Sequence, residues 1–299
     1  MALPHHCPLT PSQSLEDQVL LHMSLASSPR NNPLRVCVAG VTGDVGRLLT
    51  STLLAQKDLV LASAVARSTA GRSVGDVLGC DCAVSIRSSV VDALAKDQFD
   101  VLVDYTSAKA AFENVRVAVS SSIHVVVGSS GITAEQFDIL DGEARAHGVG
   151  VLHGNFAITA VLAQVFAACA AQYIKSWEII EYAHDDKIDA ISGTARELAS
   201  RLAKHGPPEQ AIAPEAFFGD CRSRGASVEG TQVHAIRLPG FVFGFETIFG
   251  RAHERLTIRH DTDSHAEPFI EGTLLAIRNM PRLIGMHRGL ESVLDLRFT

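Results

Sequence analysis

The feature that most constrains the fold of this chain is a regular alternation of short apolar runs with segments of helical periodicity. The apolar, strand-like runs lie at residues 34–39, 59–66, 101–103, 124–127 and 150–153. The helical patterns between them lie at residues 47–56, 108–119 and 133–146, the last with Thr133 as N-cap and Gln136 at the capping-box position. Strands that alternate with helices form a parallel sheet with right-handed crossovers, so residues 34–155 are predicted to form a doubly wound α/β domain.

The second half of the chain has a different pattern. The segments with a clear pattern are a long apolar helix at 159–173, a strand at 177–182, and strand-like runs at 233–238, 240–249 and 255–259. Few helices lie between these runs, which favours an α+β domain with a mostly antiparallel sheet over residues 156–267. A helical pattern at 268–280 and a strand-like run at 293–296 follow.

The first 33 residues differ from the rest. They are rich in Ser, Asn and Pro, and they lack the basic region and long apolar run of a secretory signal. Glu16 and Asp17 argue against a transit peptide, which is poor in acids. We expect residues 1–33 to be a flexible extension with one short helix near residues 15–25.

Composition excludes several classes of function. Lys and Arg number 26 against 33 Asp and Glu, a net charge of −7, so the chain has no global attraction for nucleic acid. No uninterrupted apolar stretch reaches ~18 residues, so we expect no membrane span. The six cysteines include only one close pair, Cys80 and Cys82. That spacing lacks the second ligand pair of a structural zinc site, so we expect reduced cysteines, no metal and a cytoplasmic location.

Three glycines follow the first predicted strand and precede a helix. Gly40, Gly43 and Gly46 are spaced as G-x-x-G-x-x-G, with Thr42, Asp44 and Val45 between them. In this strand-turn-helix context, glycines permit a tight turn, a close approach of backbone N–H groups to a pyrophosphate, and close packing of helix on strand. The motif therefore predicts a Rossmann-like dinucleotide site. The alternative is that the glycines only make a tight turn.

The end of the second strand bears on the choice of cofactor. An acid at this place binds the ribose 2′-hydroxyl of NAD, and an Arg accommodates the 2′-phosphate of NADP. Here Arg67 and Ser68 follow the strand without an acid, which favours NADPH, with NADH as the alternative. Against this preference, the carboxylate of Asp44 in the glycine loop would repel the 2′-phosphate of NADPH. The alternative for Arg67 is an ordinary solvated surface residue with no role in binding.

Two later loops follow strands at the same predicted edge of the sheet. Tyr105 and Thr106 come after one strand, and Gly128, Ser129 and Ser130 come after the next. Ligands of open α/β sheets bind at the carboxyl ends of the strands, where glycines and small hydroxyl residues can flank a nicotinamide closely.

The segment 181–195 carries the residues that suggest chemistry. Ser192, Gly193 and Thr194 open a helix that runs to residue 202, so their hydroxyl and N–H groups offer a site for a carboxylate. Lys187 lies just before this site and can supply a positive charge and a proton, and His184 is close in sequence. Together they suggest a small acidic substrate.

These motifs resemble those of the dihydrodipicolinate reductase family, whose pattern is close to E-x-H-H-x-x-K-x-D-A-P-S-G-T-A. The other matching segments are the glycine loop, residues 104–106 for D-F-T, 128–131 for G-T-T-G, 154–156 for P-N-F, 257–261, the helix with Gly272, and 289–296. The resemblance covers nearly everything from Leu34 to the C-terminus.

The resemblance implies a fold and an activity. It implies a nucleotide domain to which residues 268–299 return, a second domain that binds substrate and forms a homotetramer, and hydride transfer from NADPH or NADH to a cyclic unsaturated imine dicarboxylate of lysine biosynthesis. Lys187 would donate a proton or stabilise charge, His184 would contact substrate, and Ser192, Gly193 and Thr194 would hold a carboxylate. The residues expected at the cofactor are Gly40, Thr42, Gly43, Asp44, Val45, Gly46, Arg67, Tyr105, Thr106, Gly128, Ser129, Ser130, Asn155 and Phe156.

The chain also departs from the family pattern. Ala183 stands where the family has its usual proton-donating His, and alanine cannot transfer a proton. Ile191 replaces a Pro, Asp185 and Asp186 add negative charge, and the Arg expected after His260 has no clear equivalent. Two alternatives to the family reaction are therefore a diverged reductase for a different imine or enone, and a non-catalytic nucleotide-binding paralogue.

Overall fold

The computed structural model describes residues 32–129, 131–241, 243–263 and 265–296. The chain divides into two units, 1–33 and 34–299, and everything below concerns the second. The helix expected near residues 15–25 lies outside the described residues. No helix in the described part of the chain has the length and apolar character to cross a membrane.

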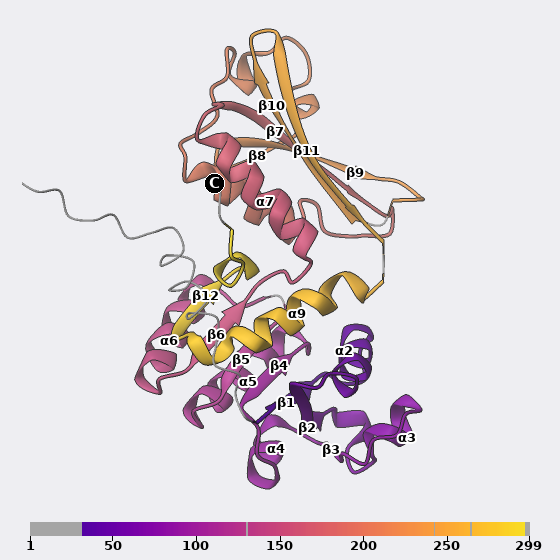
Figure 1. Cartoon of the computed structure of the whole chain (residues 1–299). Coiled ribbons are helices and arrows are strands. Elements are labelled where there is room, and N and C mark those ends of the chain that lie inside the picture. The colour runs from indigo at the N-terminus through magenta and orange to yellow at the C-terminus, as the bar shows by residue number, and fades with distance from the viewer. Residues whose placement is uncertain (1–31, 130, 242, 264, 297–299) are drawn as a thin grey trace, which may run out of the picture. The chain divides into compact units, whose positions relative to one another are not determined.

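A seven-stranded sheet forms one half of this unit (Figure 1), and all its neighbouring strands are parallel. Its order is β12-β6-β5-β4-β1-β2-β3. The strands are β1 (Leu34–Ala39), β2 (Leu59–Val65), β3 (Ile86–Arg87), β4 (Val101–Asp104), β5 (His124–Val127), β6 (Gly150–His153) and β12 (Gly285–Arg288). The predicted doubly wound parallel sheet is thus confirmed.

Helices cover both faces of this sheet because successive strand residues point to opposite sides. Val36 and Val38 of β1 belong to a core with residues of α2 and α9, whereas Cys37 and Ala39 belong to a second core with residues of α4, α5 and α6. The helices are α2 (Asp44–Leu54), α3 (Val74–Leu78), α4 (Val90–Lys96), α5 (Ala108–Ser120), α6 (Ala134–Ala146) and α9 (Glu267–Asn279). The capping box expected at the start of α6 is present.

A five-stranded sheet forms the other half, in the order β11-β10-β7-β9-β8. Its strands are β7 (Ser176–Ala183), β8 (Ala226–Val228), β9 (Thr231–Arg237), β10 (Phe243–Arg251) and β11 (Glu254–Thr262). Only the β7–β9 pair is parallel, so the expectation of a mostly antiparallel sheet is confirmed. One face packs on α7 (Ile158–Ala171) and α8 (Gly193–Ala203) through a core that includes Trp177, Phe245, Phe249 and Leu198.

The prediction of a strand at residues 293–296 is wrong. A 3-10 helix spans Leu290–Ser292, and Val293 and Leu294 pack against the first core instead. The last strand is β12, which pairs with β6. Its sequence, GMHR, has no strand-like pattern, so the neighbouring β6 backbone decides that it forms a strand.

Several short elements were not predicted from the sequence. The helices α3 and α4 and the strands β3 and β8 are too short to show a period against their polar residues. The strand β10 also begins later than expected, at Phe243, because a turn with Gly240 at φ +88° precedes it.

Candidate active site

The glycine loop lies where β1 passes into α2. Gly40 has φ +88°, and a Cβ there would lie 2.4 Å from the carbonyl oxygen of Tyr105. A Cβ on Gly46 would lie 2.0 Å from the carbonyl oxygen of Gly40, so helix and turn touch at this point. No side chain caps the first turn of α2, which leaves its N–H groups for a ligand. This geometry fits the pyrophosphate of a dinucleotide.

The order of the sheet reverses between β1 and β4, since β2 and β3 extend to one side and β5 and β6 to the other. Ligands of open α/β sheets bind in the crevice at this reversal, outside the carboxyl ends of the strands. Gly40 follows β1 and Tyr105 follows β4, and their backbones meet there.

Asp104, at the end of β4, organises the loops around this crevice. Its side chain is fully buried, and one oxygen accepts hydrogen bonds from the Thr106 N–H (2.9 Å), the Thr106 hydroxyl (2.7 Å) and the Ser129 hydroxyl (2.9 Å). The other oxygen accepts one from Asn114 Nδ2 (2.8 Å). Asp104 therefore joins two predicted cofactor loops to α5.

Tyr105 forms one wall of the crevice. The Thr273 hydroxyl donates to the Phe269 carbonyl oxygen (2.7 Å), so the Tyr105 hydroxyl donates to Thr273 (2.6 Å). Burial raises the pKa of Tyr105 well above its ordinary value, which keeps the phenol neutral. A Cβ on Gly128 would lie 2.1 Å from the Tyr105 ring, so only glycine allows the ring to lie there.

The N-terminus of α8 forms the opposite wall. The Ser192 hydroxyl caps the helix by accepting from the Ala195 N–H (3.3 Å). The first N–H groups of a helix have no intrahelical partner, so those of Gly193 and Thr194 remain for an anion. Lys187 is held beside this end by an ion pair with Asp189. The hydrogen bond from Lys187 lowers the pKa of Asp189.

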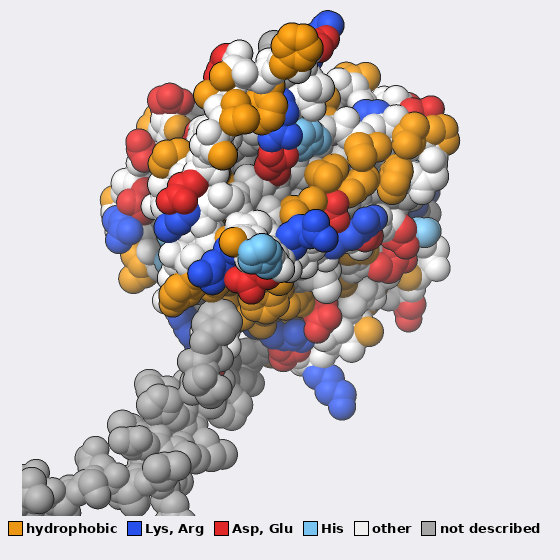
Figure 2. Space-filling view, turned by 90° about the horizontal axis from the view of Figure 1, so that it is seen from above, with side chains coloured by type: hydrophobic (Ala, Val, Ile, Leu, Met, Phe, Trp, Pro, Cys, Tyr) orange, Lys and Arg blue, Asp and Glu red, His pale blue; other side chains and the backbone are white. Residues whose placement is uncertain are grey.

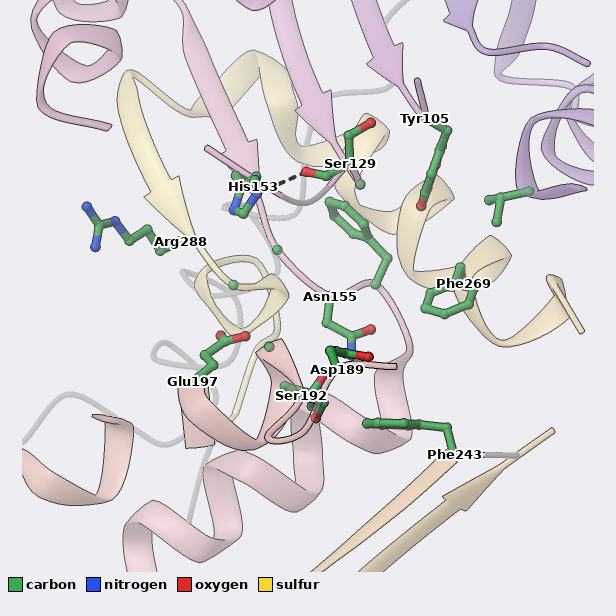
Figure 3. A pocket seen from close by; sticks show the side chains of 18 of the residues that line it. Tyr105, Ser129, His153, Asn155, Asp189, Ser192, Glu197, Phe243, Phe269 and Arg288 are labelled. Carbon is green, nitrogen blue, oxygen red and sulfur yellow. Dashed lines mark hydrogen bonds between the residues drawn. The ribbon is translucent and has the colours of Figure 1, made fainter. Parts of the chain in front are cut away.

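The two walls enclose one cavity of about 770 Å³ (Figure 3), a size typical of a small-molecule site. Its lining residues are Val45, Tyr105, Gly128, Ser129, Gly131, Phe137, His153, Gly154, Asn155, Phe156, Lys187, Asp189, Ser192, Gly193, Thr194, Glu197, Phe243, Phe269, Arg288 and Gly289. Both halves of the unit thus contribute residues to one site.

The cavity unites many of the residues predicted from the sequence. Those that line it are Val45, Tyr105, Gly128, Ser129, Asn155, Phe156, Lys187, Ser192, Gly193 and Thr194. Those that do not line it are Gly40, Thr42, Gly43, Asp44, Gly46, Arg67, Thr106 and His184. The glycine loop lies between β1 and α2, and Thr106 is hydrogen-bonded to Asp104. Arg67 is exposed shortly after β2, and Ser130 lies outside the described residues.

His184 has neighbours of its own. Its Nδ1 lies 3.0 Å from a carboxylate oxygen of Asp185 and 2.9 Å from one of Asp186. Its side chain is half exposed. Lys187 is therefore the better-placed of the two residues predicted to act on the substrate.

Several residues that line the cavity were not predicted from the sequence. His153 Nε2 donates to the Ser129 carbonyl oxygen (3.2 Å), as the dashed line in Figure 3 shows, and burial lowers the pKa of His153. Its position at the end of a predicted strand was a signal that could have found it. Arg288, whose guanidinium lies 4.0 Å from the Phe137 ring, gave no such signal because its strand was not predicted.

Glu197 is another missed residue, one helical turn after Thr194 on α8. In Figure 3 its carboxyl group points into the cavity. Partial desolvation by neighbouring side chains raises the pKa of Glu197, although the side chain remains nearly half exposed and Arg201 partly opposes the shift.

Ala183, where the family has a histidine, is fully buried at the end of β7. The register pairs it with Phe243 of β10, which lines the cavity. Directly paired residues of neighbouring strands lie on the same face of a sheet, so the Phe243 ring lies beside the small Ala183 side chain.

Family comparisons cover nearly all of the described chain. Residues 34–156 match the model described as "Dihydrodipicolinate reductase, N-terminus", and residues 157–294 match "Dihydrodipicolinate reductase, C-terminus". Proteins named 4-hydroxy-tetrahydrodipicolinate reductase are 41% identical in Moorella thermoacetica and 36% identical in Thermosynechococcus vestitus. Each match covers 88% of this chain and 98% of the relative.

Solved structures agree with these matches. A dipicolinate-bound dihydrodipicolinate reductase from Paenisporosarcina sp. TG-14 has a TM-score of 0.75 at 29% identity, covering 88% of this chain and all of that one. An amine dehydrogenase from Mycobacterium smegmatis has a TM-score of 0.66 at 14% identity, covering 91% of this chain and 99% of that one, and shares only the fold. Since both family models match consecutively and relatives above 30% identity are covered almost completely, the chain belongs to the dihydrodipicolinate reductase family.

Proposed function

We propose that this chain catalyses the reaction for which its relatives are named, the reduction of 4-hydroxy-tetrahydrodipicolinate in lysine biosynthesis. One observation supports the proposal: a single cavity is lined by Lys187 and the N-terminus of α8 together with residues of the loops after β4 and β5, which are predicted to hold the cofactor. Nothing in the comparisons favours a different imine or enone, or a protein without activity.

Residues of one wall of the cavity bind the cofactor, and residues of the other wall bind the substrate. A nicotinamide cofactor, when bound, supplies a hydride. Tyr105, Gly128 and Phe156 fit that group because they form a close-packed, largely apolar wall at the sheet's carboxyl edge. The N–H groups of Gly193 and Thr194 hold a carboxylate of the substrate.

Lys187 supplies the charge and the proton on the substrate side. Its ammonium carries three N–H donors and reaches the cavity beside Asp189. Because Ala183 cannot transfer a proton, we assign the proton that completes the reduction to Lys187. Water from the solvent restores that proton, since the Lys187 side chain is about one-third exposed.

We further propose NADPH as the preferred cofactor. Arg67 and Ser68 follow β2 after the single residue Ala66, both side chains are exposed, and neither of these two positions carries an acid. Replacing Arg67 with Ala removes a charged hydrogen bond to a 2′-phosphate, worth about 1.5–3 kcal/mol or roughly 10–150-fold in affinity. NADPH binding should weaken by this factor while NADH binding stays unchanged; equal effects on both would contradict the assignment.

Turnover is the direct test of the proposed reaction. Freshly generated substrate is added to the purified chain with NADPH and then with NADH, and the absorbance of reduced nicotinamide is followed. We expect rapid oxidation that depends on the substrate. Measurable NADPH binding without oxidation would refute the proposed reaction.

The role of Lys187 has its own test. Lys187→Ala should lower kcat by about 10²–10⁴-fold, the usual contribution of a general acid, while NADPH binds as before. His184→Ala is the comparison variant, since His184 comes from the same loop and is also predicted to contact substrate but does not line the cavity, and we expect it to lower kcat less than Lys187→Ala does. An equal loss of kcat in both variants would contradict the assignment of Lys187 as the proton donor.

We propose a homotetramer in the cytoplasm, with an assembly domain at residues 156–267. Apolar side chains gather in patches on the face seen in Figure 2. Large exposed apolar residues within 156–267 include Ile212, Phe217, Phe218 and Leu256. Exposed apolar patches commonly mark interfaces between subunits. Sedimentation at several concentrations tests the assembly, and a monomer at all of them would refute it.

A further inference from the structure

A buried ion pair lies directly behind the N-terminus of α8. Glu181 of β7 is 1% exposed and Arg237 of β9 is 16% exposed, and their side chains meet at 2.6 Å. The register pairs Glu181 with Ala235 and Ala183 with Arg237. Residues two apart on a strand share a face, so both side chains lie on the face covered by α8.

Both members of the pair also hold the loop that carries Lys187. The two carboxylate oxygens of Glu181 accept from the Ser192 N–H at 3.2 and 3.0 Å. Arg237 donates to the carbonyl oxygen of Asp189 at 2.6 Å. The loop between β7 and α8 is thus fixed at two points, one on each side of residues 190–191.

The directions of these bonds decide which groups remain for a ligand. The Ser192 N–H points back to Glu181, and the oxygen of the Ser192 hydroxyl accepts from the Ala195 N–H, which leaves only the O–H of Ser192 free to donate. The helix start therefore presents the N–H groups of Gly193 and Thr194 to the cavity, beside Lys187.

The charges of the pair matter as much as its bonds. A carboxylate behind a helix N-terminus stabilises the helix dipole but opposes an anionic ligand at the same end. Arg237 balances the charge of Glu181, and Asp189 balances that of Lys187. The pair can therefore hold the helix start in place without adding net negative charge behind the anion site.

We infer that Glu181 and Arg237 are positioning residues, which set the loop 184–192 and the start of α8 for one carboxylate of the substrate. This inference rests on the proposed function, since it assigns that end of the cavity to a dicarboxylate. Neither residue lines the cavity, so both act through Ser192 and Asp189.

Three variants separate the bonds from the charge. In Glu181→Gln, the side chain has one oxygen to serve both Ser192 and Arg237. In Arg237→Met, the carboxylate of Glu181 is left buried and uncompensated behind the anion site. In the double variant, the Gln oxygen is free to accept from Ser192 and no charge remains.

Binding of dipicolinate, with NADPH saturating, is the main readout. We expect its Kd to rise about 10-fold in Glu181→Gln, which corresponds to ~1.4 kcal/mol, and further in Arg237→Met. The double variant should bind better than Arg237→Met. The Kd of NADPH should stay within 3-fold, and KM for the substrate should rise more than kcat falls.

The control is Asp97→Asn, which breaks the ion pair between Asp97 and Arg87. Neither of these residues lines the cavity. We expect it to lower Tm but leave the Kd of dipicolinate unchanged. If Glu181→Gln and the double variant lower Tm in the same way and bind dipicolinate as the wild type does, the pair is only structural and the inference is overturned.

Hydrogen exchange keeps the inference separate from the proposed function. In the free protein, the Ser192 amide should be protected in the wild type, exchange at least 10-fold faster in Glu181→Gln, and regain protection in the double variant. If the wild type neither binds dipicolinate nor reduces the substrate, the proposed function fails, while this exchange pattern still reports whether the pair positions the loop. Unchanged exchange in Glu181→Gln would overturn the positioning role. The hydrogen-exchange test does not require the Arg237→Met variant to fold, because it compares the wild type only with Glu181→Gln and the double variant.

Discussion

Replacing Asp104 with Asn tests whether one buried carboxylate organises the cofactor side of the site. The substitution keeps the shape of the side chain but turns one of its two acceptor oxygens into an NH₂ donor. The least disruptive orientation places this NH₂ against Asn114 Nδ2, since the other oxygen serves Thr106 and Ser129. A donor then faces a donor in a fully buried position.

The size of the effect follows from these contacts. One hydrogen bond to a charged group is lost, worth about 1.5–3 kcal/mol, and the three to the other oxygen weaken because their acceptor becomes neutral. Relief of the buried charge offsets part of this loss. We expect the free energy of unfolding to fall by about 3 kcal/mol, which lowers Tm by roughly 6–12 °C in a domain of this size.

Urea unfolding followed by circular dichroism measures the free energy, and the thermal shift on adding NADPH measures binding. NADPH should bind about 10-fold more weakly, because the loops of Thr106 and Ser129 lose their common anchor. The compensating variant Asp104→Asn/Asn114→Asp exchanges donor and acceptor and should recover at least half of the lost stability. A single variant within ~0.5 kcal/mol of the wild type, or no recovery in the double, would refute the reasoning.

Three further predictions concern other parts of the site. Gly128→Ala places a methyl group 2.1 Å from the Tyr105 ring, so we expect NADPH binding to weaken at least 10-fold in a titration, and an unchanged Kd would show that the ring moves freely. Ala183→His overfills a fully buried position and should cost about 1–3 kcal/mol in urea unfolding, with recovery in Ala183→His/Phe243→Ala; failure to recover would mean that Phe243 does not fill this space. Burial lowers the pKa of His153, so the unfolded chain binds its proton more readily and stability falls as pH drops below about 6.5; the pH dependence of Tm should be shallower in His153→Gln, and an identical slope would contradict this.

Both walls of the cavity could be predicted in part from the sequence, each from a different set of residues. The cofactor wall could be predicted because strand, glycine loop and helix follow one another within residues 34–56, and the carboxyl ends of parallel strands meet at one edge. The substrate wall was predicted from Ser192–Thr194 and Lys187, which are also close in sequence. The contributions of His153, Glu197 and Arg288 could not be predicted as a group because they come from three separate elements.

The sequence by itself determined the family, the parallel sheet, the mostly antiparallel second sheet and the helix start at Ser192. These features depend on local periodicity, capping and turn chemistry, which act over a few residues. It did not determine that GMHR forms strand β12, that Phe243 lies beside Ala183, or that Glu181 and Arg237 pair behind α8. Only the tertiary structure decided these, because each depends on the register and packing of segments far apart in the chain.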